Sequence, residues 1–159
     1  MPPPNNMDAY LNNHYQGKTP EQLIQMLYKG ALRNITLAKE GVKENNPKKR
    51  GEHIGKTIAI ITELYTCLDS EIKDESIQFL SALYSNMLTE LPKVSITNDV
   101  KALELTYSYI KQLNHIWETE VLKLNDQQES ESNQATSGSK YKDSVIKQSN
   151  YHPPKSLFA

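Results

Sequence analysis

The residue types that carry out catalysis or bind metals are few in this chain and poorly spaced for either role. The four histidines fall on four different segments, with no H-x-x-x-H pair among them: His14, His53, His115 and His152. The sequence also lacks a C-x-x-C pair and the Glu-x-x-His pairs that di-iron helical bundles supply from facing helices. A metal site needs several such ligands converging on one ion, so we expect no metal site.

Nucleophilic and phosphate-binding chemistry is equally unsupported. Cys67 is the single cysteine, and its place in an apolar helical stretch is typical of a small buried hydrophobic residue. One cysteine cannot form an intramolecular disulfide, which fits a reducing compartment. The glycine-rich phosphate-binding motifs and the G-x-S-x-G motif are absent. We therefore expect a protein that is not an enzyme and uses no cofactor.

Composition excludes two further classes of function. The 159 residues carry a formal net charge of -1, so the chain lacks the basic field that nucleic-acid binding requires. No apolar run approaches the ~20 residues of a membrane span, and the N-terminus has no cationic start followed by an apolar stretch. These features predict a cytoplasmic protein that neither binds nucleic acid nor inserts stably into membranes.

Helical signals dominate the remainder of the chain. Thr19 is suited to be an N-cap, Pro20 occupies the first helical position, and Gln22 is placed to complete a capping box. Apolar residues then recur every three or four positions, as in one helical face: Ile24, Leu27, Tyr28, Ala31, Ile35, Ala38 and Val42. Gly41 and the stretch 45–47 predict the end of this helix.

Three more helices follow by the same reasoning. The second is expected over about 48–71. The third is capped by Asp74 or Ser76 and ends at Pro92, because proline does not readily continue a helix. The fourth begins after the capping residues 97–99 and shows heptad spacing, with the polar Asn114 in its seam. Short connections and the absence of strand signals predict an all-α fold, an antiparallel up-and-down four-helix bundle over residues 19–124. Residues 1–18 are expected to form an N-terminal arm, and residues 125–159 a flexible, largely disordered C-terminal tail.

Two helices carry apolar residues beyond the single stripe that a bundle core needs. The second helix adds Ile60 and Tyr65, and the fourth adds a second row that comprises Leu105, Tyr109, Leu113 and Ile116. Nine tyrosines against two phenylalanines favour amphipathic surface of the kind found at protein interfaces. Bundle helices with wide apolar faces, whose phenols simply reach solvent, explain the same pattern. Both interpretations remain open at this point.

Several motifs resemble those of one family, the FliS flagellar secretion chaperones. Residues 9–13 are similar to its A-Y-x-x-N opening, and residues 19–31 to its [ST]-P-x-x-L-I-x-M-L-Y-[DE]-G signature. Shorter similarities follow in the expected order at residues 63–64, 68–69, 98–99 and 117. The resemblance covers about residues 8–122. Lys29 stands where the family usually has an acidic residue, and the resemblance says nothing about the tail.

The resemblance implies an antiparallel helical bundle that binds the disordered C-terminal region of flagellin in the cytoplasm. Such a chaperone prevents premature polymerisation and assists delivery to the flagellar type III export apparatus. The client would lie along the bundle in helix-in-groove fashion, and the arm around Tyr10 and Tyr15 would cover part of the hydrophobic surface when no client is bound. The candidate flagellin-binding groove or arm residues are Tyr10, Tyr15, Ile24, Tyr28, Ile61, Tyr65, Leu105, Tyr109, Leu113 and Ile116.

Two alternatives stand beside this prediction. Leu27 and Tyr28 match the family signature, yet core packing is the role that we expect of them. The same scaffold also suits an adaptor for the export apparatus or another flagellar regulator. A metal-dependent bundle oxidase, the enzymatic alternative, lacks the ligands described above.

Overall fold

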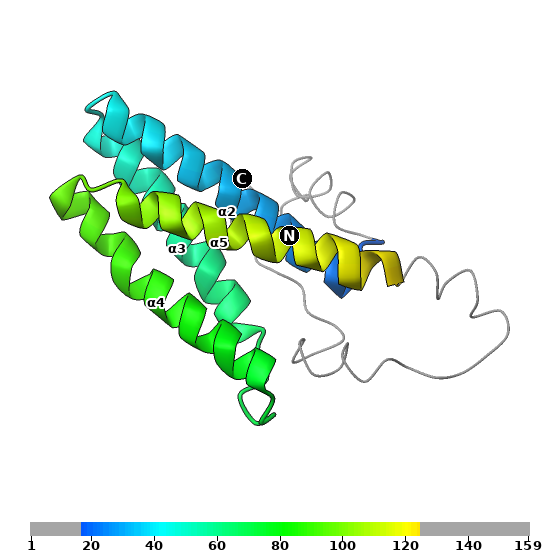
Figure 1. The fold of residues 1–159 in the computed structure, drawn as a ribbon. Coiled ribbons are helices and arrows are strands. Elements are labelled where there is room, and N and C mark those ends of the chain that lie inside the picture. Colours follow the sequence, from blue (N-terminus) through cyan, green and yellow to red (C-terminus); the bar gives the residue numbers. More distant parts are fainter. Residues whose placement is uncertain (1–16, 125–159) are drawn as a thin grey trace, which may run out of the picture.

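A computed structural model describes residues 17–124 of the chain. This part is entirely helical, with α2 (Pro20–Lys43), α3 (Pro47–Thr66), α4 (Glu75–Thr97) and α5 (Lys101–Ile116). A π-helical segment, η1 (Trp117–Leu122), continues α5 (Figure 1). The predicted N-terminal arm and C-terminal tail lie outside the described residues, apart from Gly17 and Lys18. None of the described helices is long and apolar enough to cross a membrane.

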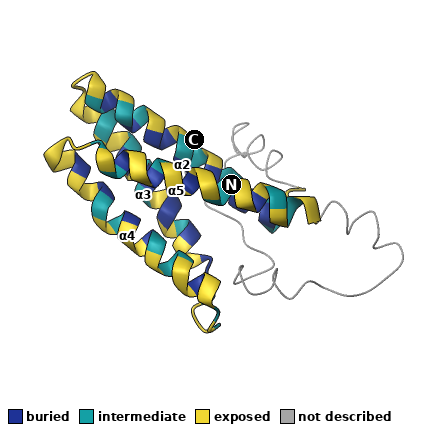
Figure 2. Ribbon diagram, in the orientation of Figure 1, coloured by how far each residue is buried: buried dark blue, intermediate teal, exposed yellow. Residues whose placement is uncertain are grey.

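The four helices form the predicted antiparallel four-helix bundle. α2 packs against α3 and α5, while α4 packs against α3 and, over a shorter length, against α5. Figure 1 shows why that last contact is short: α4 and α5 are joined by a tight connection and diverge toward their other ends. Figure 2 shows the buried residues following inward-facing stripes along the helices. The bundle is therefore closed along α2 and α3 and more open between α4 and α5.

Side-chain caps begin α2, α3 and α4, of which those of α2 and α4 were predicted, whereas α5, predicted to be capped from residues 97–99, begins at Val100 without a side-chain cap. The Thr19 backbone N–H donates to Gln22 Oε1 over 3.0 Å, and the Gln22 N–H donates to Thr19 Oγ1 over 3.2 Å, which completes the predicted capping box. Asn46 Oδ1 accepts from the Lys49 N–H at the start of α3. Asp74, one of the two predicted caps of α4, accepts from the Ser76 N–H. These contacts satisfy N–H groups that have no partner inside the helix.

The second helix ends earlier than predicted. Apolar spacing predicted a helix to about residue 71, but α3 ends at Thr66. Cys67 and Leu68 remain buried, while Asp69 Oδ1 accepts a hydrogen bond from the Glu71 N–H. Asp side chains that bond to the backbone two residues on stabilise turns. A turn therefore continues the apolar pattern here without helical backbone.

Pro92 was wrongly predicted to end the third helix, because α4 continues through it to Thr97. Pro92 lies on the exposed side of α4, whereas Leu91 and Val94 are almost fully buried. Proline in a helix interior costs about 3 kcal/mol, and the burial of these two side chains offsets that cost. Asn98, in the left-handed region with φ of 55°, then ends the helix.

Arg50 ties the start of α3 to the end of α4. Its guanidinium donates to the Ser95 carbonyl oxygen over 3.2 Å and to Asn98 Oδ1. The backbone of Arg50 lies so close to α2 that a Cβ added at Gly41 would come within 2.6 Å of its nitrogen. Gly41 therefore sets how closely α2 and α3 approach at this end of the bundle.

A buried polar contact joins helices that lie across the bundle from each other. The hydroxyl groups of Tyr28 on α2 and Tyr84 on α4 are 2.8 Å apart. The Tyr28 ring makes an edge-on contact with Trp117, with centroids 6.1 Å apart. Trp117 Nε1 in turn donates to the Glu21 carbonyl oxygen over 2.8 Å. These contacts bring α2, α4 and η1 together at one point in the core.

The chain changes from α-helix to π-helix at Trp117. The Trp117 N–H contacts the carbonyl oxygens of both Leu113 and Asn114, and the following turn is one residue wider than an α-helical turn. Asn114 is half-buried near this end of the bundle, and its Oδ1 has no hydrogen-bond partner among the described residues. The predicted heptad seam therefore runs in α-helical geometry as far as Ile116 and in π-helical geometry from Trp117 on.

We expect Gly41→Ala to lower the free energy of unfolding by about 1–3 kcal/mol, because the added methyl group overpacks the α2–α3 contact. Gly55→Ala is the matched control. Gly55 also lies inside a helix, and an added Cβ there meets no atom within 4 Å. Alanine at that site should stabilise the protein by about 0.5–1 kcal/mol. Urea unfolding at constant m-value measures both changes, and equal stabilisation by the two substitutions would contradict the close approach.

We expect the two core tyrosines to be coupled. Burial raises the pKa of Tyr28 to about 12 and the pKa of Tyr84 well above its usual value of 10, so both hydroxyls are neutral at physiological pH. Tyr28→Phe and Tyr84→Phe should each cost about 1–3 kcal/mol, because each leaves a buried hydroxyl without its partner. The double variant should cost no more than the larger single change. Additive losses in a double-mutant cycle would show that the contact contributes nothing.

Candidate functional site

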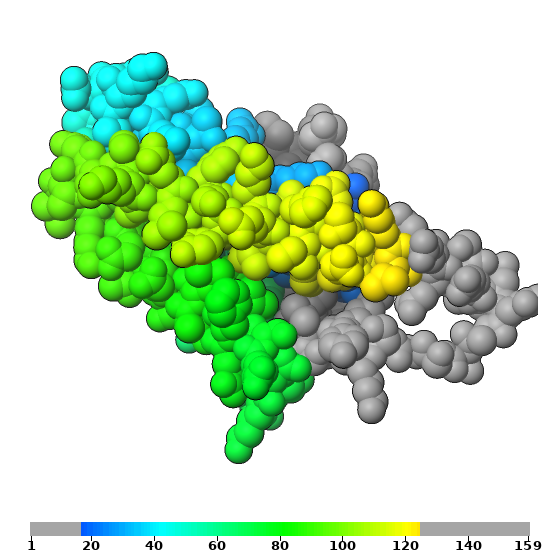
Figure 3. Space-filling model, in the orientation of Figure 1, coloured from blue at the N-terminus to red at the C-terminus, as the bar shows by residue number. Residues whose placement is uncertain are grey.

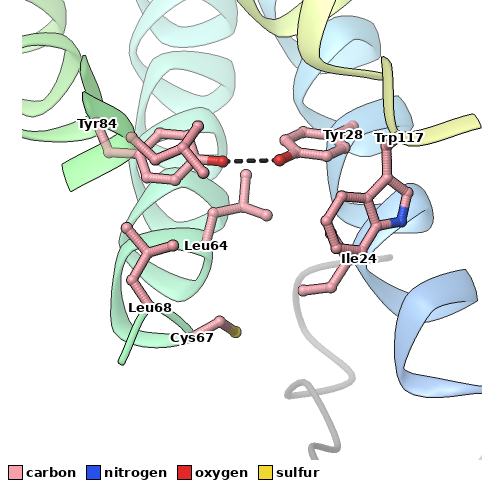
Figure 4. Close-up of a pocket in the computed structure, with 8 residues that line it drawn as sticks. Ile24, Tyr28, Leu64, Cys67, Leu68, Tyr84 and Trp117 are labelled. Atoms are coloured by element: carbon pink, nitrogen blue, oxygen red, sulfur yellow. Dashed lines mark hydrogen bonds between the residues drawn. The ribbon is translucent and has the colours of Figure 1, made fainter. Parts of the chain in front are cut away.

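A small hollow lies at the end of the bundle where the core tyrosines meet. It has a volume of about 10 Å³, room for a single water molecule at most. Figure 4 shows the side chains around it, which are Ile24, Tyr28, Leu64, Cys67, Leu68, Leu80, Tyr84 and Trp117. This hollow is too small to receive a segment of another protein.

Three of the predicted binding residues belong to the core. Ile24, Tyr28 and Ile61 are 4%, 3% and 0% exposed. Neighbouring side chains cover them in this conformation, so a partner would reach them only if the helices moved apart. Ile60, expected beside the main stripe of α3, is also fully buried; α3 lies between α2 and α4 and therefore buries a wide arc.

An open cleft lies between α4 and α5, beside the connection that joins them. It has a volume of about 230 Å³ and is lined by Asn86, Met87, Glu90, Asp99, Lys101, Ala102, Leu105, Thr106 and Tyr109. The space-filling view in Figure 3 shows α4 and α5 side by side on the face toward the viewer. Among the packed α-helix pairs of the bundle, α4 and α5 contact each other over the shortest length.

The α5 wall of the cleft is the second apolar row predicted from the sequence. Leu105 is 52% exposed and Tyr109 36% exposed, and Ile116 farther along is 53% exposed. Leu113, between them, is half-buried. Positions 105, 109, 113 and 116 are spaced by four, four and three residues, so they share one flank of the helix. The row begins inside the cleft and continues along α5 beyond the point where α4 diverges.

Beyond the cleft lining, α4 carries an exposed apolar residue that sequence reasoning missed. Phe79 is 63% exposed, and it precedes the cleft residue Asn86 by seven positions, or about two helical turns. It therefore lies on the same flank of α4 as Asn86, toward the opposite end of the helix from the α4–α5 connection. Its signal in the sequence was its position outside the stripe formed by Ile77, Leu80 and Tyr84. An exposed phenylalanine off the core stripe has no polar end to reach solvent, so its position is itself a signal of apolar surface.

The remaining predicted residues do not join this cleft. Tyr65 is 40% exposed but lies on α3, which contributes no residue to the lining. Tyr10 and Tyr15 lie outside the described residues. The structure thus gathers four of the ten predicted residues, all from α5, into one exposed apolar row.

Polar contacts border the cleft without placing a reactive group in it. Glu90 accepts from Lys93 Nζ over 2.7 Å, and Asp99 Oδ1 accepts from the Lys101 backbone N–H over 2.9 Å. On the other flank of α5, Glu104 pairs with Lys39 of α2 at 3.6 Å. Exposed ion pairs of this kind contribute little to stability. They leave an apolar floor with a charged edge, an arrangement suited to binding a peptide segment.

The described residues contain no group of three or more His, Cys, Asp or Glu side chains that could hold a metal ion. His53 contacts Asn34 Oδ1 through Nδ1 at 2.8 Å, and desolvation lowers its pKa. This pair lies between α2 and α3, away from the cleft lining. The α4–α5 cleft, with the exposed α5 row that opens into it, is the candidate functional site.

Comparison with known proteins assigns the chain to a family. A family model described as flagellar protein FliS matches residues 3–124. The chain is 35% identical over 103 residues to the flagellar secretion chaperone FliS of Escherichia coli (strain K12), covering 64% of this chain and 76% of that protein. It is 30% identical over 109 residues to the protein of the same name from Bacillus subtilis (strain 168), covering 69% and 80%. The chain, with its bundle and its exposed α5 row, belongs to the FliS family of flagellar proteins.

Proposed function

We propose that this protein is a flagellar export chaperone that binds the disordered C-terminal segment of flagellin along the α4–α5 cleft. The observation that carries the proposal is the exposed apolar row of α5, which opens into a cleft rather than packing against α4. The names of the relatives, which are flagellar secretion chaperones, support the export role.

The size and shape of the cleft favour a helical client. The row from Leu105 to Ile116 spans eleven residues, or about 17 Å along the helix axis. An amphipathic helix with apolar residues every three or four positions would match this row. Phe79, on the flank of α4 beyond the cleft, would contact the opposite side of the same client helix. A client that folds on binding loses typically 2–5 kcal/mol or more to ordering. The client therefore needs further contacts beyond the 230 Å³ cleft.

Binding of this kind explains how a chaperone would act without covalent chemistry. A chaperone that covers the C-terminal segment of flagellin would prevent premature polymerisation. The complex would form in the cytoplasm and deliver the subunit to the flagellar type III export apparatus. No cofactor, metal or nucleotide enters this mechanism.

The direct test is calorimetric titration of the full chain with a synthetic C-terminal segment of flagellin from the same organism. Binding should show a negative heat-capacity change, because apolar surface is buried, and a gain of helicity measured by circular dichroism. Absence of binding would contradict the proposal and favour the adaptor alternative.

Two exposed tyrosines offer a matched pair of variants that locates the site. Tyr109→Ser should weaken client binding at least tenfold, because it removes a large apolar contact from the cleft. Tyr65→Ser removes a tyrosine of similar exposure, 40% against 36%, from outside the cleft and should change affinity less than twofold. Thermal unfolding of both variants is the control that checks whether they fold. A larger loss for Tyr65→Ser than for Tyr109→Ser would place the client on α3 and overturn the assignment to the cleft.

A further inference from the structure

We propose that residues 140–158 of this chain, here called the C-terminal segment, dock in the α4–α5 cleft of the same molecule. The segment would cover the exposed α5 row when no client is bound, and a client would have to displace it. The docking of the segment does not rest on the proposed function. The competition between the segment and flagellin for the cleft does rest on it.

The cleft and the helix flanks that continue it expose apolar side chains of the kind that a binding partner covers. Phe79, Leu105 and Ile116 are each more than half exposed, and they lie on the two facing flanks of a diverging helix pair. Their neighbours on these flanks include Tyr109 and the half-buried Leu113. Apolar patches of this kind on a soluble protein mark interaction sites. The other described helix flanks carry no comparable row, since Tyr65 and Ile96 are isolated.

The position and length of the chain beyond Leu124 allow the docking. Leu124 ends the described residues one turn beyond Val121 and lies nineteen residues after Leu105, which is about 28 Å along a helix axis. The polar stretch 125–139 has fifteen residues. Such a stretch spans about 50 Å when fully extended and about 20 Å as a flexible coil. It therefore brings the C-terminal segment back along α5 without stretching, at an effective concentration on the order of millimolar.

The composition of the C-terminal segment suits the cleft. The stretch 125–139 has one apolar residue, Ala135, whereas the segment contains six larger ones: Tyr141, Val145, Ile146, Tyr151, Leu157 and Phe158. Tyr141 and Val145, four residues apart, would share one face of a helix, and Ile146 would widen the apolar surface beside Val145. Segment 140–158 also has four lysines against one acidic residue, Asp143. η1, which continues α5 from the open end of the cleft, carries the exposed Glu118 and Glu120, so the charges are complementary.

Paramagnetic labelling of the full chain tests the docking. In a Cys67→Ala background, Ser149→Cys places a nitroxide label inside the C-terminal segment. Docking predicts that the label broadens the backbone amide signals of Leu105 and Tyr109. The amides of Arg33 and Gly55, on exposed sides of α2 and α3, should stay sharp. Broadening spread evenly over both faces, or confined to α2 and α3, would overturn the proposal.

A substitution in the segment supplies the matched control. Val145→Ser combined with Ile146→Ser removes the central apolar pair without touching the bundle, and it should abolish the broadening at Leu105 and Tyr109. Broadening that persists unchanged in this variant would overturn docking through the apolar face of the segment.

Titration of the same full-length chains with the flagellin segment tests the competition. The Val145→Ser, Ile146→Ser chain should bind flagellin 3- to 10-fold more tightly than the unaltered chain, because no internal occupant has to leave. Gln148→Ala, a polar change in the same segment, should leave the affinity unchanged. Equal affinity of the unaltered and doubly substituted chains would overturn the competition. Broadening in the cleft without any flagellin binding would instead support the docking and refute the proposed function, so the two failures are distinguishable.

Discussion

The contact between Tyr28 and Tyr84 is the interaction on which the arrangement of the bundle depends. It joins α2 to α4 across the core through two hydroxyls 2.8 Å apart. Trp117 packs edge-on against the Tyr28 ring, and its Nε1–H donates to the Glu21 carbonyl oxygen in the first turn of α2. A buried hydroxyl without a partner costs free energy, so this contact specifies which helices meet and in what register. Purely apolar residues would fill the same space but would select among alternative packings less sharply.

With that end of the core fixed, the rest of the bundle follows from how much apolar surface each helix has to bury. α2 is enclosed by α3, α5 and η1. At the other end, Gly41 allows α2 and α3 to approach closely, and Arg50 joins α3 to the end of α4. α4 is held by α3 and by the tyrosine contact, while its contact with α5 is brief. The apolar row on the flank of α5 therefore has no helix of the bundle to cover it. The cleft is a consequence of the same packing that stabilises the core.

A surface of this kind gives the protein one site for occupants that compete. A helical client would place an apolar face on the α5 row, and the chain's own C-terminal segment would offer the larger apolar residues that it carries between Tyr141 and Phe158. Because the internal segment is tethered, it needs little intrinsic affinity to occupy the cleft at an effective concentration on the order of millimolar. An exposed row would then be protected from nonspecific association until a client arrives, and binding would depend on the difference between two affinities.

The sequence by itself determined the helices, their capping residues and the second apolar row of α5, because these depend on local hydrogen bonding and on a spacing of three to four residues. Its family motifs also indicated the family. Only the tertiary structure decided which apolar residues are accessible. Spacing places both Ile60 and Tyr65 beside the main stripe of α3, yet Ile60 is fully buried and Tyr65 is 40% exposed, since exposure depends on which neighbours a helix acquires. The continuation of α4 through Pro92 and the exposure of Phe79 were also decided by tertiary packing. Burial of Leu91 and Val94 on the opposite face of α4 stabilises the helix through Pro92. The divergence of α4 from α5 leaves Phe79 exposed.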